Sequence, residues 1–118
     1  MVLEVTEEST NTMMHVDGID MELIQMGPFY CATATVTIVD ATDNPVEGAT
    51  ISGHWEDATN DQDSGVTDSD GQTPPLQSNY RWSSSGTTFT FVLDDVTKEG
   101  GTYDPDANNE TEDSVIVP

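Results

Sequence analysis

The stretch CATATVTIV, residues 31–39, alternates apolar and threonine side chains almost one by one. This alternation has the period of a β-strand, in which successive side chains point to opposite faces of a sheet. It predicts one face made by Ala32, Ala34, Val36 and Ile38, and a second face of threonines in contact with water. A chain that contains such a strand needs a second layer to cover the apolar face.

Two other runs predict strands of the same kind. In TTFTFVLDDV, residues 87–96, aromatic and aliphatic side chains alternate with threonine, and in ATISGHW, residues 49–55, the alternation ends at Trp55. The other residues predicted to face inward in these runs are Phe89, Phe91, Leu93, Ala49, Ile51 and Gly53. Trp55 is therefore the candidate for the large aromatic residue at the centre of the core.

Seven runs of strand-like composition are separated by Gly, Pro, Asp, Asn and Ser, the residues that favour turns. The runs span residues 12–16, 21–26, 31–39, 49–55, 76–82, 87–96 and 114–118. No segment has the apolar spacing of three and four that a helix needs. This pattern indicates an all-β sandwich. We expect one domain at residues 12–118, preceded at residues 1–11 by a loosely ordered leader or an edge strand.

The chain has 23 acidic and 2 basic residues among 118, for a formal net charge of −21. Phosphate backbones and anionic lipids repel such a surface, so we expect no nucleic-acid partner. No run approaches the roughly 20 apolar residues of a membrane helix, so we expect no membrane insertion. Two explanations of the acidity remain, adaptation to high salt and binding of divalent cations. The spread of the acids along the whole chain favours the first.

One candidate calcium site is TYDPDANNETED, residues 102–113. Asp104, Asp106, Asn108 and Glu110 have a D-x-D-x-N-x-E spacing, which can turn several oxygens toward one cation at about 2.4 Å. The glycine and the distal glutamate of an EF-hand loop are absent. The alternative is a solvated acidic connection before the last strand.

A second acidic cluster lies in EDATNDQDSGVTDSDG, residues 56–71. Carboxylates this crowded repel one another unless salt screens them or a cation bridges them. The candidate ligands are Asp61, Asp63, Asp68 and Asp70. The simpler interpretation of Asp68 and Asp70 is that they form a turn before Gly71.

Tyr80 and Trp82 are two positions apart, so on a strand they share a face. The plainer interpretation of the pair is core packing. The alternative is an aromatic platform for a sugar ring, which would make the domain a carbohydrate-binding module.

The sequence predicts no enzyme. His15, His54 and Cys31 are a conceivable thiol or metal set, but nothing in the sequence brings them together. Motifs for acyl transfer, nucleotide hydrolysis and dithiol redox chemistry are absent. Cys31 is the only cysteine, and we expect it to be a small buried residue in or beside a strand.

The stretch ATVTIVDATDNPVEGATISGHW resembles the bacterial and archaeal immunoglobulin-like domains of the invasin/intimin-like group. It is also similar to immunoglobulin-like modules at the C-termini of secreted proteases and nucleases, and the resemblance covers about residues 13–118. It implies an immunoglobulin-like sandwich of about seven strands. Some relatives carry two cysteines beside the T-D-x-x-G turn, and this chain has none there. The matching residues are Val39, Asp40, Asn44, Pro45, Val46, Gly48 and Ala49 in the first motif, and Thr67, Asp68 and Gly71 in the turn.

The resemblance implies a non-catalytic accessory or interaction module of a secreted or cell-surface protein, with a protein partner or neighbouring domains of a parent chain. One alternative is a calcium-dependent adhesion or filament-assembly subunit, in which residues 1–11 supply a donor strand to an exposed sheet edge. The other is the carbohydrate-binding module.

Overall fold

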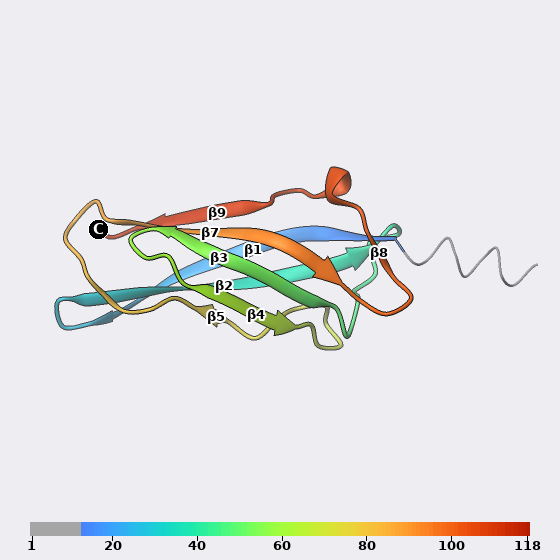
Figure 1. Ribbon diagram of the computed structural model, residues 1–118, viewed down its shortest axis with the longest axis horizontal. Coiled ribbons are helices and arrows are strands. Elements are labelled where there is room, and N and C mark those ends of the chain that lie inside the picture. The colour runs from blue at the N-terminus through green and yellow to red at the C-terminus, as the bar shows by residue number, and fades with distance from the viewer. Residues whose placement is uncertain (1–12) are drawn as a thin grey trace, which may run out of the picture.

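The computed structural model describes residues 13–118 as two β-sheets packed face to face in an immunoglobulin-like sandwich (Figure 1), which confirms the predicted fold class. The leader or donor strand expected at residues 1–11 lies outside the described residues. The first sheet has the order β5 (Leu76–Gln77), β2 (Phe29–Asp40), β1 (Met13–Met26) and β8 (Thr102–Tyr103), with β6 (Arg81–Trp82) paired to β2. The second sheet has the order β4 (Gln62–Val66), β3 (Thr50–Asp57), β7 (Thr88–Thr97) and β9 (Glu112–Ile116). A short 3-10 helix, η1 (Pro105–Ala107), precedes β9.

β1 is one strand of 14 residues, so the prediction of two strands at residues 12–16 and 21–26 is wrong. The Asp-Gly pair at 17–18 does not turn the chain, because a β-bulge between Val16 and Gly18 absorbs the extra residue against β2. The bulge shifts the alternation by one position. Val16 and Ile19 are therefore both buried in the core, although they are three residues apart.

The predicted inward faces of the three alternating runs are confirmed. Ala32, Ala34, Val36 and Ile38 are fully buried in β2, and Phe89, Phe91 and Leu93 are buried in β7. Trp55 is 1% exposed and packs edge to face on Phe91, with ring centroids 5.1 Å apart. Cys31 is buried in β2, as expected.

Residues 76–82 were expected to form one strand but make two short pairings, β5 and β6. Between them, the Ser78 hydroxyl accepts a hydrogen bond from Ala32 N at 3.0 Å, so a side chain replaces a strand carbonyl. β4 and β8 were not predicted from the sequence. β4 carries one large apolar residue, Val66, and β8 is two residues long, so neither has a readable alternation.

The sandwich is long and narrow (Figure 1). At about 3.3 Å per residue, β1 alone runs for roughly 45 Å. The described chain enters at Met13 beside β8 and leaves at Pro118 at the opposite end of the long axis. Within residues 13–118, no helix is long and apolar enough to cross a membrane.

Candidate functional site

The acidic connection before β9 lies along the edge of β1 at its bulge. Asn108 Oδ1 accepts a hydrogen bond from Val16 N at 2.7 Å, and Glu110 Oε2 accepts one from Ile19 N at 2.7 Å. Asn109 N donates to Val16 O at 3.0 Å. These contacts bond a stretch of sheet edge that β8, which pairs only with Met13 and Met14, does not reach.

The four residues predicted as calcium ligands therefore have separate environments. Asp104 N donates to Met14 O, and Asp106 is exposed in η1. The side-chain oxygens of Asn108 and Glu110 already accept hydrogen bonds from the backbone of β1. Within the described part of the chain, no three His, Cys, Asp or Glu residues are grouped as a metal site would need. Calcium binding by this segment stays a prediction.

Three of the candidate ligands in the second acidic cluster, Asp61, Asp63 and Asp68, accept hydrogen bonds from different partners. Asp61 accepts from the Thr59 hydroxyl at 2.6 Å, and Asp63 accepts from Trp55 Nε1 at 2.7 Å. Burial raises the pKa of Asp63, the bond from Trp55 opposes this rise, and the charge of Asp61 adds to it. This cluster extends over β4 and the loops beside it, and cation binding here also stays a prediction.

Asp68 does form the turn that the sequence predicts. Its Oδ1 accepts from the backbone N–H groups of Asp70 and Gln72, and Gly71 N donates to its backbone carbonyl. Gly71 has a φ of 78°, and a Cβ at this position would come within 2.6 Å of Ile38 O. Glycine is therefore needed for both the backbone conformation and the close approach.

The turn after β2 and the turn after β4 are bonded to each other. The Thr67 hydroxyl donates to Val46 O at 2.6 Å and accepts from Ala49 N at 2.9 Å. In the first turn, Asp40 Oδ1 accepts from Asn44 N and from Thr42. Burial favours a higher pKa for Asp40, but these hydrogen bonds outweigh it and lower the pKa. This network joins the two turns at the Met13 end without a disulfide.

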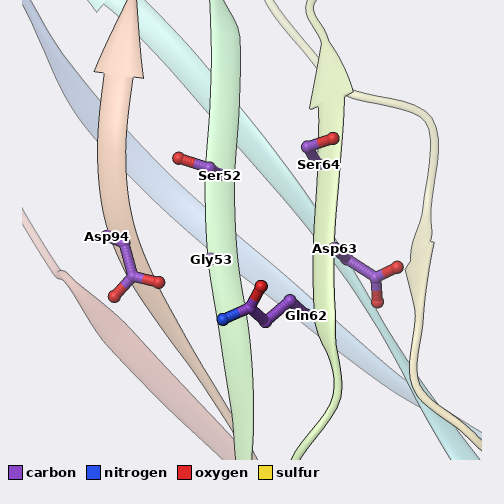
Figure 2. A pocket seen from close by; sticks show the side chains of 6 residues that line it. All are labelled: Ser52, Gly53, Gln62, Asp63, Ser64 and Asp94. Carbon is purple, nitrogen blue, oxygen red and sulfur yellow. The ribbon is translucent and has the colours of Figure 1, made fainter.

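A shallow hollow of about 570 Å³ lies over the second sheet. Figure 2 shows Gln62 and Asp94 reaching toward each other across β3, while Asp63 points away from them. The floor is Gly53, where a Cβ would overlap the Phe91 ring and Val92 O. The full lining is Ser52, Gly53, Gln62, Asp63, Ser64 and Asp94.

His54 lies on β3 and is held by two carboxylates. Its Nδ1 lies 2.9 Å from both carboxylate oxygens of Asp94, and its Nε2 lies 2.9 Å from Glu56. The bonds to Asp94, then those to Glu56, raise the pKa of His54, although burial opposes the rise. Both ring nitrogens have acceptors, so the cationic form fits this site and a general base does not. Asp94 is 40 residues from His54 in the sequence, and no motif could have shown the pair.

The three residues considered as a thiol or metal set lie apart in the fold. His15 is on β1 and Cys31 on β2 of the first sheet, whereas His54 is on β3 of the second. Burial raises the pKa of the Cys31 thiol, and the bond to the Tyr80 hydroxyl opposes this rise. A buried thiol of raised pKa has little thiolate character.

The prediction of core packing is wrong for Trp82, because its side chain is 74% exposed. Its ring packs edge to face on Phe29, the residue opposite it in the sheet, with centroids 5.6 Å apart. Tyr80 is half-buried, with its hydroxyl bonded to Cys31. Of the predicted pair, Trp82 is therefore the residue more open to a ligand, and sugar binding by the pair stays a prediction.

Comparisons with known proteins return no match, since no family model, curated protein or solved structure is significantly similar to this chain.

Proposed function

We propose that this protein is a non-catalytic spacer and presentation module of a secreted or cell-surface protein. The observation that carries the proposal is the path of the chain, which enters the sandwich at Met13 and leaves at Pro118, at opposite ends of the long axis (Figure 1). A sandwich connected in this way separates whatever is joined to its two ends by its own length.

The stiffness of the body supports this role. The β1–β2 hairpin pairs from Met14 with Asp40 to Met26 with Phe29, and the core beneath it includes Trp55, Phe89 and Phe91. A close-packed core and a continuous ladder resist bending, so the separation between the ends is fixed.

The charge supports exposure to solvent. A formal net charge of −21 keeps molecules apart and soluble, which suits a module held outside a cell, in salt concentrations that screen the repulsion between its own acids. The resemblance to immunoglobulin-like domains of surface and secreted proteins points to the same location.

Small-angle X-ray scattering tests the proposal on a tandem fusion of two full chains, with Pro118 of the first copy joined to Met1 of the second. We expect a maximum dimension of at least twice that of the single chain, because the copies continue one another end to end. The control is the same fusion with a long Gly/Ser linker at the junction, which should give a broader distance distribution. A direct fusion no longer than the single chain would refute the spacer role.

A further inference from the structure

Two long segments of this acidic chain contain no Asp or Glu. They are residues 23–39 and 71–93, which together hold 40 of the 118 residues. An even distribution of the 23 acids would place about eight there. Arg81 is the only Lys, Arg, Asp or Glu in either segment. Burial explains the absence of acids on the inward faces of β2 and β7, but it does not explain their absence among the exposed residues at the tip of the β1–β2 hairpin.

The fold brings the first segment together with the part of the second that precedes β7 in the first sheet. β5 and β6, from the second segment, both pair with β2, from the first. The acid-free region therefore extends along β2 to the tip of the β1–β2 hairpin, at the end of the molecule opposite Met13 (Figure 1).

Large apolar side chains are exposed at this hairpin end. In the register, Ile24 lies opposite Cys31, Met26 opposite Phe29, and Phe29 opposite Trp82, so all five side chains share one face of the sheet. This is the outer face, because Leu23, the neighbour of Ile24, packs against the core. We name Ile24, Met26, Phe29 and Trp82 the hairpin-end patch. They are four of the six exposed large apolar residues in the described part of the chain.

We propose that the hairpin-end patch binds the same patch of a second copy of this chain, in a weak two-fold symmetric dimer. Trp82, 74% exposed, and Met26, 57% exposed, are the anchors. Tryptophan and methionine are enriched at the centres of protein interfaces, and a symmetric contact uses one surface twice. The proposal goes beyond the spacer role and does not depend on it.

The charge distribution selects a second copy over other partners. A basic protein would gain most from the acid-rich surfaces, and anionic lipids or nucleic acids would be repelled by the whole molecule. A partner that is itself strongly acidic gains from a contact without carboxylates. Two copies that meet at their hairpin-end patches bring no carboxylate of residues 23–39 or 71–93 into the contact, and the next acid along the same face of β1 is Glu22.

The size of the patch sets the strength of the dimer. A large aromatic side chain has about 150–250 Å² of surface, so four partly exposed apolar residues offer roughly 400–500 Å² per copy. Two copies would bury less than the roughly 1,200 Å² of a stable complex. We therefore expect a dimer that forms at about 0.1–1 mM protein and dissociates on dilution.

Sedimentation equilibrium of the full chain tests the proposal across this concentration range, at low and at molar sodium chloride. We expect reversible dimerisation that strengthens with salt, because salt screens the repulsion between copies. Trp82→Ser and Met26→Ser should each weaken association at least tenfold. Val66→Ser is the matched control, since Val66 is an exposed apolar residue on β4 of the other sheet and should leave the dimer unchanged. Circular dichroism checks that every variant is folded.

A second readout follows Trp82 directly. Trp55 is buried, so acrylamide quenching of the fluorescence reports mainly on Trp82. Protection from acrylamide should increase with protein concentration in the native chain and in Val66→Ser, and should be absent in Met26→Ser.

Three results would overturn the proposal. The first is a monomer at every concentration and salt level. The second is equal weakening by Val66→Ser, which would mean non-specific association. The third is a dimer that survives Trp82→Ser but is lost when residues 1–12 are deleted, which would assign assembly to the N-terminal segment. A monomer whose Trp82 is protected only by a neutral oligosaccharide would identify the patch as a sugar site instead.

Discussion

The carboxylate of Glu110 accepts a hydrogen bond from the backbone N–H of Ile19 at 2.7 Å. This contact lies just after the bulge in β1, where a regular neighbouring strand could not follow the shifted register. Side chains adapt to the irregular spacing better than a strand does. The acidic connection before β9 therefore has a structural role at a sheet edge, whether or not it also binds cations.

Removing the Asn108 side chain should destabilise the fold. Asn108→Ala leaves the N–H of Val16, a fully buried residue, without its acceptor, at a cost of about 1–3 kcal/mol. Asp106→Ala is the matched control, because Asp106 is exposed in η1, and should change stability by less than about 0.5 kcal/mol. Urea unfolding measures both, and equal losses would show that Asn108 does not support the edge.

Calcium and magnesium should stabilise the protein equally. Asn108 and Glu110 already bond to β1, so we expect divalent cations to act by screening carboxylates and to raise the unfolding midpoint without selectivity. Thermal unfolding in millimolar calcium, in millimolar magnesium and in molar sodium chloride compares them. A calcium-specific rise that disappears in Asp104→Asn with Asp106→Asn would establish the metal site predicted from the sequence.

Two replacements of Asp63 should distinguish the contribution of its hydrogen bond to stability from that of its charge. Asp63→Ala leaves Trp55 Nε1 without an acceptor and should cost about 1–3 kcal/mol. Asp63→Asn keeps an acceptor and removes a carboxylate whose pKa burial raises, so at pH 7 it should be at least as stable as the native chain. This advantage should shrink as the pH falls through the folded pKa of Asp63, because the native carboxyl then becomes neutral too. Chemical unfolding at pH 7 and pH 4 measures both differences. If Asp63→Asn were less stable than the native chain at pH 7, the charge itself would stabilise the fold.

The stability due to His54 should depend on pH. Its pKa is raised in the folded state, so its contribution is complete below the unfolded pKa of about 6.5 and is lost as the pH rises through the folded pKa. The site is largely open to solvent, so screening limits the effect to at most about 1 kcal/mol. The midpoint difference between the native chain and His54→Gln should shrink from pH 6 toward pH 9. A difference that is constant with pH would exclude the ion pairs as its source.

A methyl group at position 53 should disturb the core. A Cβ on Gly53 would overlap the Phe91 ring, which also packs on Trp55, so Gly53→Ala should cost about 1–3 kcal/mol. Gly86→Ala is not a suitable control, because Gly86 has a φ of 92° and an alanine there would strain the backbone. Ser52→Ala, on the outward side of the same strand, is suitable and should be nearly neutral. Equal effects in thermal unfolding would contradict the packing argument.

Alternation predicted the parts of the fold in which one sheet face is buried and the other is wet. β2, β3 and β7 follow this rule, and every inward residue named for them is buried. The rule failed at Asp17 and Gly18, where the sequence signal of a turn and that of a bulge are the same dipeptide. It also failed at β4, an edge strand that pairs with β3 although it has little apolar pattern of its own.

The candidate site was harder to predict for a physical reason. Asn108 and Glu110 were noticed for their oxygens, but their partners, Val16 and Ile19, are about 90 residues away in the sequence. The contact between His54 and Asp94 is also created by the pairing of distant strands. Local spacing shows which side chains have hydrogen-bonding capacity, whereas the sheet register decides where that capacity is used.

The opposite placement of Met13 and Pro118 has a mechanical consequence. β1 leads away from Met13 and β9 leads toward Pro118, so tension between the two ends would pull each strand lengthwise along its neighbour, β2 or β7 (Figure 1). Under such shear many ladder hydrogen bonds share the load at once, whereas peeling breaks them one by one. A chain connected in this way is suited to carry tension between whatever it joins.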